Sequence, residues 1–324
     1  MDFFTRVNIP ASSIRIDYTK HIAFFGSCFA DNIAAQFAAR KFNVLSNPFG
    51  TVYNPLSIEQ QLREIADGKK FGEKDVFQDA HGTWHSYDAH SSLSAASREE
   101  CIAKLNAATN NAREFLKQAD TVFITLGTAF VYSLDGRIVA NCHRQDPRLF
   151  ERRMITVDEA AEAIRGTVEC VRKIAGRDLH IVFTVSPLRH MGDGAHGNNL
   201  SKATLLLAVE KALSGIQASA IPAEYFPSYE IVMDELRDYR FYESDMVHLS
   251  ETAEGYIFEK MLDTYCDGAT RENIRAVEKF MKMANHRIAD TSIANGFLQR
   301  VANEATSLEA KIAGLDLGKE KKLP

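Results

Sequence analysis

The sequence predicts an α/β protein, a three-layer α/β/α sandwich in which helices cover both faces of a mostly parallel sheet, followed by a helical extension. Short apolar runs typical of buried strands, such as Thr121–Leu126 and His180–Val185, alternate with stretches of helical periodicity. Strands joined by helices of this length favour βαβ crossovers, which place neighbouring strands in parallel. Beyond Asp267 only helical periodicity remains.

The N-terminal part of the chain shows this alternation clearly. An apolar run at His21–Phe25 predicts the first strand, and Ile33 and Phe37, four residues apart, predict one buried face of the helix that follows. We expect a short strand at Phe42–Leu45 and helices near residues 57–66 and 98–117.

The middle of the chain carries two strong local signals. Asp135-Gly136 predicts the turn of a hairpin over residues 130–142. Thr156 and Glu159 form a capping box that opens a helix to about Ile174. The later elements are a helix near residues 199–219, a last strand at Tyr229–Met233, helices near 271–283 and 291–312, and a charged tail at 318–324.

This pattern divides the chain into an α/β domain over residues 1–265 and a C-terminal helical extension with its tail over residues 266–324. The extension could pack on the α/β core or form a subunit contact in a homo-oligomer. The sequence leaves both open.

Composition indicates an ordinary globular protein. The 324 residues are 45% hydrophobic and 25% charged, and a net charge of −5 gives no support to nucleic-acid binding. No apolar run reaches 18 residues and the N-terminus has no signal-peptide pattern, so we expect neither secretion nor a membrane span. Five cysteines without a C-x-x-C pair favour reduced thiols in the cytoplasm.

The most informative motif joins the first strand to the first helix. Gly26-Ser27-Cys28 follows the apolar run directly, so two adjacent nucleophile candidates lie at a strand-to-helix turn. The N–H groups and dipole of a helix N-terminus favour a thiolate or an oxyanion. The alternative is a tight structural turn with a buried cysteine.

A second motif lies late in the chain. Asp245 and His248 are three residues apart just before Ser250, which can cap the next helix. A carboxylate so placed can accept the Nδ1–H of the imidazole and leave Nε2 free to take a proton from a nucleophile.

These motifs closely resemble the GSCFA family, named for the pentapeptide at Gly26–Ala30, which is usually placed among the SGNH, or GDSL, hydrolase-like proteins. Further segments that resemble the family are Asn47–Pro55, Leu126–Ala129, Ala140–His143, Ser186–His190, Tyr225–Glu230 and Asp245–His248. The resemblance implies a flavodoxin-like sheet and an acyl-transfer or ester-hydrolysis framework without a cofactor.

The resemblance also assigns roles, with two departures. The superfamily serine stands two residues after the glycine, where this chain has Cys28; we therefore favour Cys28 as nucleophile, with Ser27 as alternative. The asparagine that would donate to the oxyanion is replaced by Ala129. The candidate substitutes are the N–H groups of Cys28 and Gly50 and the residues Thr128, Asn141 and His143.

Histidines gather between residues 81 and 91 beside the only tryptophan. No metal-ligand spacing is distinctive there, so we expect a substrate-facing loop, or a solvated polar loop, rather than a metal site. The candidate substrate-binding residues are Trp84, His90, His143, Arg189 and His190, with Arg144 and Lys202 as further positive charges; for each, the alternative is a structural or surface role.

Three functions remain open. The first is an acyl hydrolase or acyltransferase acting on an ester or thioester, including an acylated carbohydrate. In this function His248 relays the proton and Asp245 orients the His248 ring. The second is a catalytically weak glycan- or metabolite-binding relative, motivated by Ala129. The third is a metal-dependent hydrolase that uses the histidine cluster.

Overall fold

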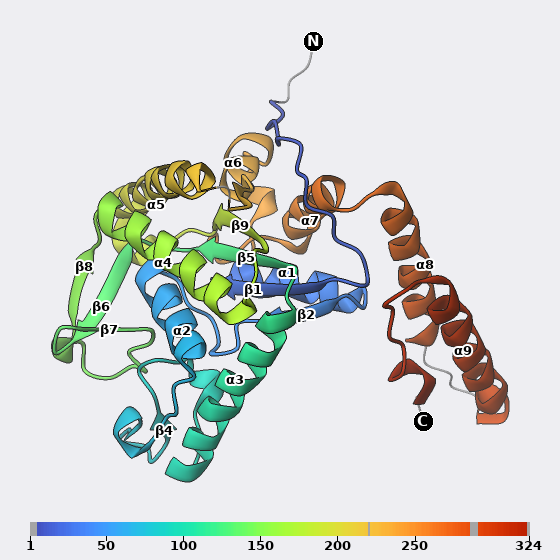
Figure 1. Ribbon diagram of the computed structural model, residues 1–324, viewed down its shortest axis with the longest axis horizontal. Helices are drawn as coiled ribbons and strands as arrows, with labels where there is room; N and C mark the ends of the chain where they lie inside the picture. The colour runs from blue at the N-terminus through green and yellow to red at the C-terminus, as the bar shows by residue number, and fades with distance from the viewer. Residues whose placement is uncertain (1–4, 220, 286–290, 323–324) are drawn as a thin grey trace.

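A five-stranded sheet forms the centre of the computed structural model, which describes residues 5–219, 221–285 and 291–322 (Figure 1). Every strand pair in this sheet is parallel. Its strands are β1 (His21–Gly26), β2 (Asn43–Ser46), β5 (Thr121–Leu126), β9 (His180–Val185) and β10 (Ala223–Tyr225). Their order is β10-β9-β5-β1-β2, which confirms the predicted flavodoxin-like arrangement.

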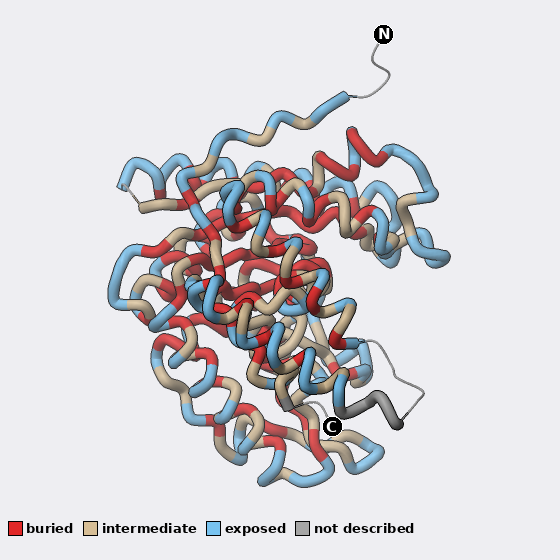
Figure 2. The backbone as a smooth tube through the Cα atoms, turned by 90° about the vertical axis from the view of Figure 1, so that its right-hand side faces the viewer, coloured by how far each residue is buried: buried red, intermediate tan, exposed pale blue. Residues whose placement is uncertain are grey.

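Helices cover both faces of the sheet. One face packs against α2 (Pro55–Asp67), α3 (Arg98–Gln118), α4 (Val157–Ala175) and α5 (Gly194–Ala218). The other packs against α1 (Cys28–Ala39) and α7 (Glu251–Tyr265), and α8 (Gly268–Ala284) and α9 (Thr291–Lys311) join the same hydrophobic cluster. Buried backbone therefore runs through the middle of the molecule, as Figure 2 shows, and the predicted three-layer α/β/α sandwich is confirmed.

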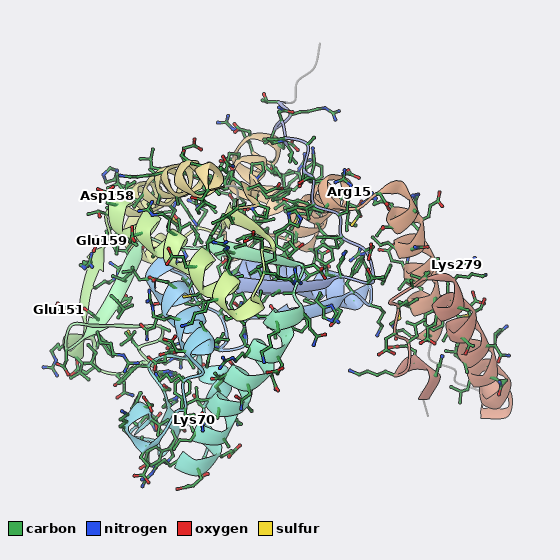
Figure 3. All side chains as sticks on the ribbon, in the orientation of Figure 1. Arg15, Lys70, Glu151, Asp158, Glu159 and Lys279 are labelled. Carbon is green, nitrogen blue, oxygen red and sulfur yellow. The ribbon has the colours of Figure 1, made fainter. Side chains whose placement is uncertain are left out.

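Local sequence signals explain several element boundaries. The predicted capping box is present: the Glu159 N–H donates to the Thr156 hydroxyl, and the Glu159 carboxylate accepts from the Thr156 N–H. Glu159 lies at the start of α4 (Figure 3). The hairpin of β6 (Phe130–Leu134) and β7 (Arg137–Val139) turns at Asp135-Gly136, as expected.

One predicted strand is wrong. Residues 229–233 are helical, in α6 (Ser228–Glu230) and the π-helical turn that follows it (Ile231–Glu235), and the last strand is β10 instead. The Ser228 hydroxyl donates to the Val185 carbonyl at 2.9 Å, which turns the chain away from the sheet after Pro227. Because Ile231 and Val232 are both buried on one helical face, their apolar run imitates a strand.

Three short strands escape the sequence patterns: β3 (Phe77–Gln78), β4 (Trp84–His85) and β8 (Glu151–Met154). All four residues of β8 are exposed, so the strand has no apolar alternation, and pairing with β6 alone defines it.

The C-terminal helices pack on the α/β core, beside β2 and α1 in Figure 1. The Arg40 guanidinium of α1 contacts the Glu278 carboxylate of α8 at 2.7 Å. In the tail, Lys321 pairs with Glu309 of α9, and Glu320 pairs with Lys41. Residues 323 and 324 of the predicted tail lie outside the described residues. No helix in the described ranges is long and apolar enough to cross a membrane.

Candidate active site at the carboxyl edge of the sheet

The turn between β1 and α1 depends on a glycine. Gly26 has φ +130°, and a Cβ atom there would lie 2.0 Å from the Thr125 carbonyl oxygen of β5. Only glycine tolerates this combination. Ser27 follows as the N-cap of α1 and Cys28 as its first residue, so both nucleophile candidates lie at the helix N-terminus.

The loop after β2 supports this turn. The Asn47 side chain accepts from the Gly26 N–H at 2.8 Å and donates to the Gly26 carbonyl at 3.1 Å. Farther along the loop, the Tyr53 carbonyl accepts from the N–H groups of Gly127 and Thr128. The turn, the loop and the end of β5 therefore form one hydrogen-bonded unit.

This unit lies at the topological switch point of the sheet. The chain after β1 leads to β2 on one side, whereas β5 lies on the other side of β1. In open α/β sheets, ligands bind at this point outside the carboxyl ends of the strands. A Cβ atom on Gly127 would lie 3.4 Å from the Ser27 Cβ, so Ser27 lies against the end of β5.

The two candidate nucleophiles differ in exposure. Ser27 is 1% exposed, and its hydroxyl has no hydrogen-bond partner within the described residues. The Cys28 side chain is half-buried. A buried hydroxyl without a partner is rare in folded proteins, so the Ser27 hydroxyl is a group that could bond a water molecule or a ligand.

The structure does not support a lowered pKa for Cys28. Burial raises the pKa of the Cys28 thiol, and the carboxylates of Asp31 and Glu254 raise it further. The N–H groups of Cys28 and Phe29 at the helix N-terminus oppose this effect. The expectation of an activated thiolate in the resting protein is therefore corrected: the thiol is protonated near neutral pH.

Asp245 and His248 interact as their spacing predicts. Nδ1 of His248 lies 2.6 Å from one carboxylate oxygen of Asp245, and the other oxygen accepts from the backbone N–H groups of Val247 and His248. These hydrogen bonds, first of all the one from the His248 ring, lower the pKa of Asp245 to about 2. The carboxylate therefore remains ionised and fixes the imidazole tautomer.

His248 lies at the same end of the molecule as the turn. Asn32 of α1 donates to Glu254 in the first turn of α7, and His248 comes just before the Ser250 cap of α7. The Glu254 carboxylate interacts electrostatically with both Cys28 and His248. No hydrogen bond joins His248 to Ser27 or Cys28 in the described structure, and the imidazole is exposed.

The predicted oxyanion donors are mostly engaged. The Gly50 N–H donates to the Asn47 carbonyl at 2.7 Å, and the Thr128 N–H donates to Tyr53. The Thr128 hydroxyl lies 3.1 Å from the hydroxyl of Ser201, which also accepts from the Ala129 N–H at 2.7 Å. Asn141, whose side-chain oxygen accepts from the His143 N–H, lines a cavity.

Sequence reasoning treated Lys202 only as part of a positive rim, but the structure buries it under the switch point. Its ammonium is 1% exposed and donates to the carbonyl oxygens of Gly127 and Ser186, each at 2.7 Å. Burial lowers the pKa of Lys202 to about 7, and the Cys28 thiolate is the charge that opposes this effect. No sequence signal separates this lysine from those on helix surfaces.

His190 and Arg189 follow β9 at the same edge. Arg189 donates to the Met246 carbonyl at 3.3 Å, which joins this loop to the loop of His248. The His190 ring packs edge-on against Tyr53 at 5.9 Å between centroids. Burial, helped by the charge of Lys202, lowers the pKa of His190 to about 4, so its imidazole is neutral at pH 7.

The remaining candidates lie in a separate histidine loop, residues 79–94. His143 lies against this loop, and its Nε2 donates to the carbonyls of Ser86 and Ala89 at 2.8 and 3.0 Å. The His90 ring nitrogen accepts from the Ser92 N–H. Trp84 packs beneath Arg98, whose guanidinium carbon lies 5.1 Å from the ring centroid. No cluster of three or more potential metal ligands occurs among the described residues.

A cavity of about 750 Å³ opens beside the switch point. Four of the predicted site residues line it: Thr128, Asn141, Arg144 and His190. Its wall also has aromatic and charged side chains from several elements, including Tyr53, Phe130, Tyr132, Phe150 and Arg152. The site thus defines a flavodoxin-like α/β protein with polar and nucleophilic groups gathered at the switch point.

The GSCFA family model matches residues 21–261, from the start of β1 into α7. The chain therefore belongs to the GSCFA family. A comparison with curated proteins finds no match.

Proposed function

We propose that the protein is an SGNH-like acyl hydrolase or acyltransferase that acts on an ester or thioester. The observation that carries this proposal is the common location of two motifs. The Ser27-Cys28 turn lies at the switch point, and a hydrogen-bonded Asp245–His248 pair lies at the same edge of the sheet. A nucleophile and an oriented base at one sheet edge are the requirements of covalent acyl transfer.

In the proposed reaction, Cys28 sulfur attacks the carbonyl carbon and His248 Nε2 accepts the thiol proton. The bond to the leaving alkoxide or thiolate breaks, and His248 returns the proton to that leaving group. Water or an acceptor hydroxyl then attacks the thioester while His248 accepts its proton, the bond from the acyl carbon to sulfur breaks, and His248 passes the proton to sulfur, which releases the acyl product and restores the thiol. Because His248 lies on an exposed loop, we expect it to approach Cys28 when substrate binds.

The N-terminus of α1 provides the oxyanion donors in this proposal. The N–H groups of Cys28 and Phe29 belong to the first turn of the helix, where no intrahelical carbonyl is available to them. Both interact with the Cys28 sulfur, so they lie next to the carbon that this sulfur would attack and could donate to the oxyanion that forms on it. The Asn141 amide in the adjoining cavity is the candidate third donor.

The cavity beside the switch point suits an acylated carbohydrate. The aromatic faces of Tyr53, Phe130 and Tyr132 can stack on sugar rings, while Asn141 and Arg152 can bond hydroxyl groups. The Arg152 guanidinium carbon lies over Phe130, at 4.0 Å from its ring centroid, so these two wall residues already contact each other.

Hydrolysis of aryl acetates and acetyl thioesters by the full chain tests the proposal. Wild-type protein should turn over at least one of these substrates, and Cys28→Ala should abolish turnover. Retained turnover in Cys28→Ala with complete loss in Ser27→Ala would transfer the nucleophile role to Ser27.

A second function, binding of a glycan or metabolite with little catalysis, has its own support. Ala129 has no side-chain donor, the Gly50 N–H is already bonded, and burial keeps the Cys28 thiol protonated. If this function holds, acylated oligosaccharides should bind to the wild-type protein without turnover, and Arg152→Ala should weaken that binding.

A further inference from the structure

A lysine buried without an acidic partner lies under the switch point. In the described part of the chain, no carboxylate comes within ion-pair distance of Lys202, and its two recorded acceptors are backbone carbonyls. Burying an unpaired ammonium costs several kcal/mol after relaxation. A leucine or methionine would fill the space between α5 and the sheet without this cost. Packing alone therefore does not explain why a charged residue occupies this position.

The backbone places Lys202 next to the candidate nucleophiles. Its ammonium donates to the Gly127 carbonyl at the end of β5. Gly127 packs against Ser27, since a Cβ atom added to Gly127 would lie 3.4 Å from the Ser27 Cβ. Ser27 directly precedes Cys28, and the Ser27 N–H bonds to β5 through the Thr125 carbonyl at 3.2 Å. Lysine, strand end and turn are therefore successive parts of one packed unit.

The charges around Cys28 explain what a cation would do there. Asp31 from α1 and Glu254 from α7 both disfavour a thiolate, and the Tyr53 hydroxyl faces the same region. On the other side, Lys202 from α5 interacts with Cys28, and it also disfavours a charge on His190. Lys202 is thus a buried cation that interacts with Cys28 with the sign opposite to that of the two carboxylates.

We infer that Lys202 is a positioning residue of this site: its ammonium, fixed on the carboxyl ends of β5 and β9, stabilises the thiolate of Cys28. The inference rests on the proposed function only in what the thiolate is used for. It concerns the reactivity of the sulfur, which can be measured without any acyl substrate.

The ammonium is present only below a pH of about 7, because burial lowers the pKa of Lys202 to about 7. Replacing Lys202 by methionine should therefore slow thiolate formation most at low pH, where the wild-type lysine is charged. The difference between the two proteins should disappear as the pH rises and the wild-type lysine becomes neutral.

Alkylation of the full chain by iodoacetamide, followed peptide by peptide with mass spectrometry from pH 6 to pH 9, tests the inference. We expect Cys28 in Lys202→Met to react about 10-fold more slowly than in wild type at pH 6, the effect of one pKa unit. The ratio should fall toward one at pH 9. Cys142, which is also half-buried, is the internal reference.

Ser201→Ala is the matched control. Ser201 also joins α5 to the end of β5, through a buried hydrogen bond from Ala129, but carries no charge. Cys28 reactivity should be unchanged in this variant. An equal loss in Ser201→Ala, a ratio that does not vary with pH, or an inert Cys28 at pH 9 would each overturn the inference.

If Lys202→Met does not fold, the pH profiles of wild type and His248→Asn give the answer. In both proteins the alkylation rate of Cys28 should increase less steeply with pH around pH 7, because Lys202 loses its charge there and no longer stabilises the thiolate. If this flattening is absent from His248→Asn, the effect belongs to the histidine, and the role of Lys202 is refuted. A missing acyl-enzyme with these profiles intact would refute the proposed function alone.

Discussion

The histidine loop and the switch-point site contain the same kinds of residue but use them differently. Against the loop, His143 is buried, its Nε2 donates to two carbonyls, and its ring centroid lies 4.5 Å from that of His85, which in turn bonds Ser94 and Asp79. At the switch point, His248 is exposed and only its Nδ1 is engaged in the described structure.

This difference separates structural histidines from candidate catalytic ones. His143 donates to two carbonyls of the neighbouring histidine loop, its Nδ1 is buried without a hydrogen-bond partner among the described residues, and burial lowers its pKa, which keeps it neutral. A histidine polarised on one nitrogen and open on the other can still exchange a proton with a ligand. The switch point also retains an unpartnered Ser27 hydroxyl and an unpaired Lys202 ammonium.

The largest effect should come from His248. In the acyl-transfer account, His248→Ala lowers kcat/KM by about 10²–10⁴ because the proton relay is lost. The free energy of unfolding should change by less than about 0.5 kcal/mol, since the ring is exposed. Ester turnover and urea unfolding of the same preparation measure both quantities. Unchanged turnover would remove His248 from the site.

Gly26→Ala should destabilise the protein by about 3 kcal/mol or more, because the added Cβ would collide with the Thr125 carbonyl at a strained positive φ. Gly136→Ala is the matched control: it also has a positive φ, but no atom lies within 4 Å of the added Cβ. We expect it to cost about 1–2 kcal/mol in urea unfolding. Equal losses would show that sterics at the turn are unimportant.

His143→Ala should show the reverse of His248→Ala and lower stability by about 2–3 kcal/mol. It removes the His143 donor from the Ala89 carbonyl, leaves the Ser86 carbonyl with the Ala89 N–H alone, and opens a cavity beside His85. His90→Ala, which keeps the Cβ that packs on Gly50, should cost no more than about 0.5 kcal/mol. A stable His143→Ala protein would contradict the structural role.

The smallest effect is a pH dependence of stability at His190. The folded protein lowers the pKa of His190 from 6.5 to about 4, so the unfolded chain binds more protons between these values. The free energy of unfolding is therefore highest above pH 6.5 and falls by about 2–3 kcal/mol as the pH decreases toward 4. Unfolding from pH 4 to pH 7 should show a shallower slope for His190→Asn than for wild type.

The sequence predicted the fold well where an element repeats a simple pattern. The runs at 121–126 and 180–185 are strands with the expected bounds, and the Thr156 capping box starts its helix at the expected residue. Prediction failed at residues 229–233, because a short apolar run is compatible with a buried helix face and a buried strand. Only the Ser228 contact with Val185 decides between them.

For the site, the sequence could locate the turn and the Asp245–His248 pair, because each is a local motif. It could not show that the Gly50 N–H bonds Asn47 or that His143 bonds the loop of residues 79–94, since both depend on the folded backbone. It also gave no means of finding Lys202 buried at the strand ends, because burial of one lysine in a long helix leaves no trace in the residue pattern.

The most direct measurement of the central claim is mass spectrometry of the intact protein and its peptides after brief exposure to an acetyl thioester. The account predicts one added acetyl group on the peptide that contains Ser27 and Cys28, located on Cys28 and absent from Cys28→Ala. In His248→Asn this group should form more slowly. Acetylation that is spread over exposed lysines, with the peptide of residues 27 and 28 unmodified, would contradict the account.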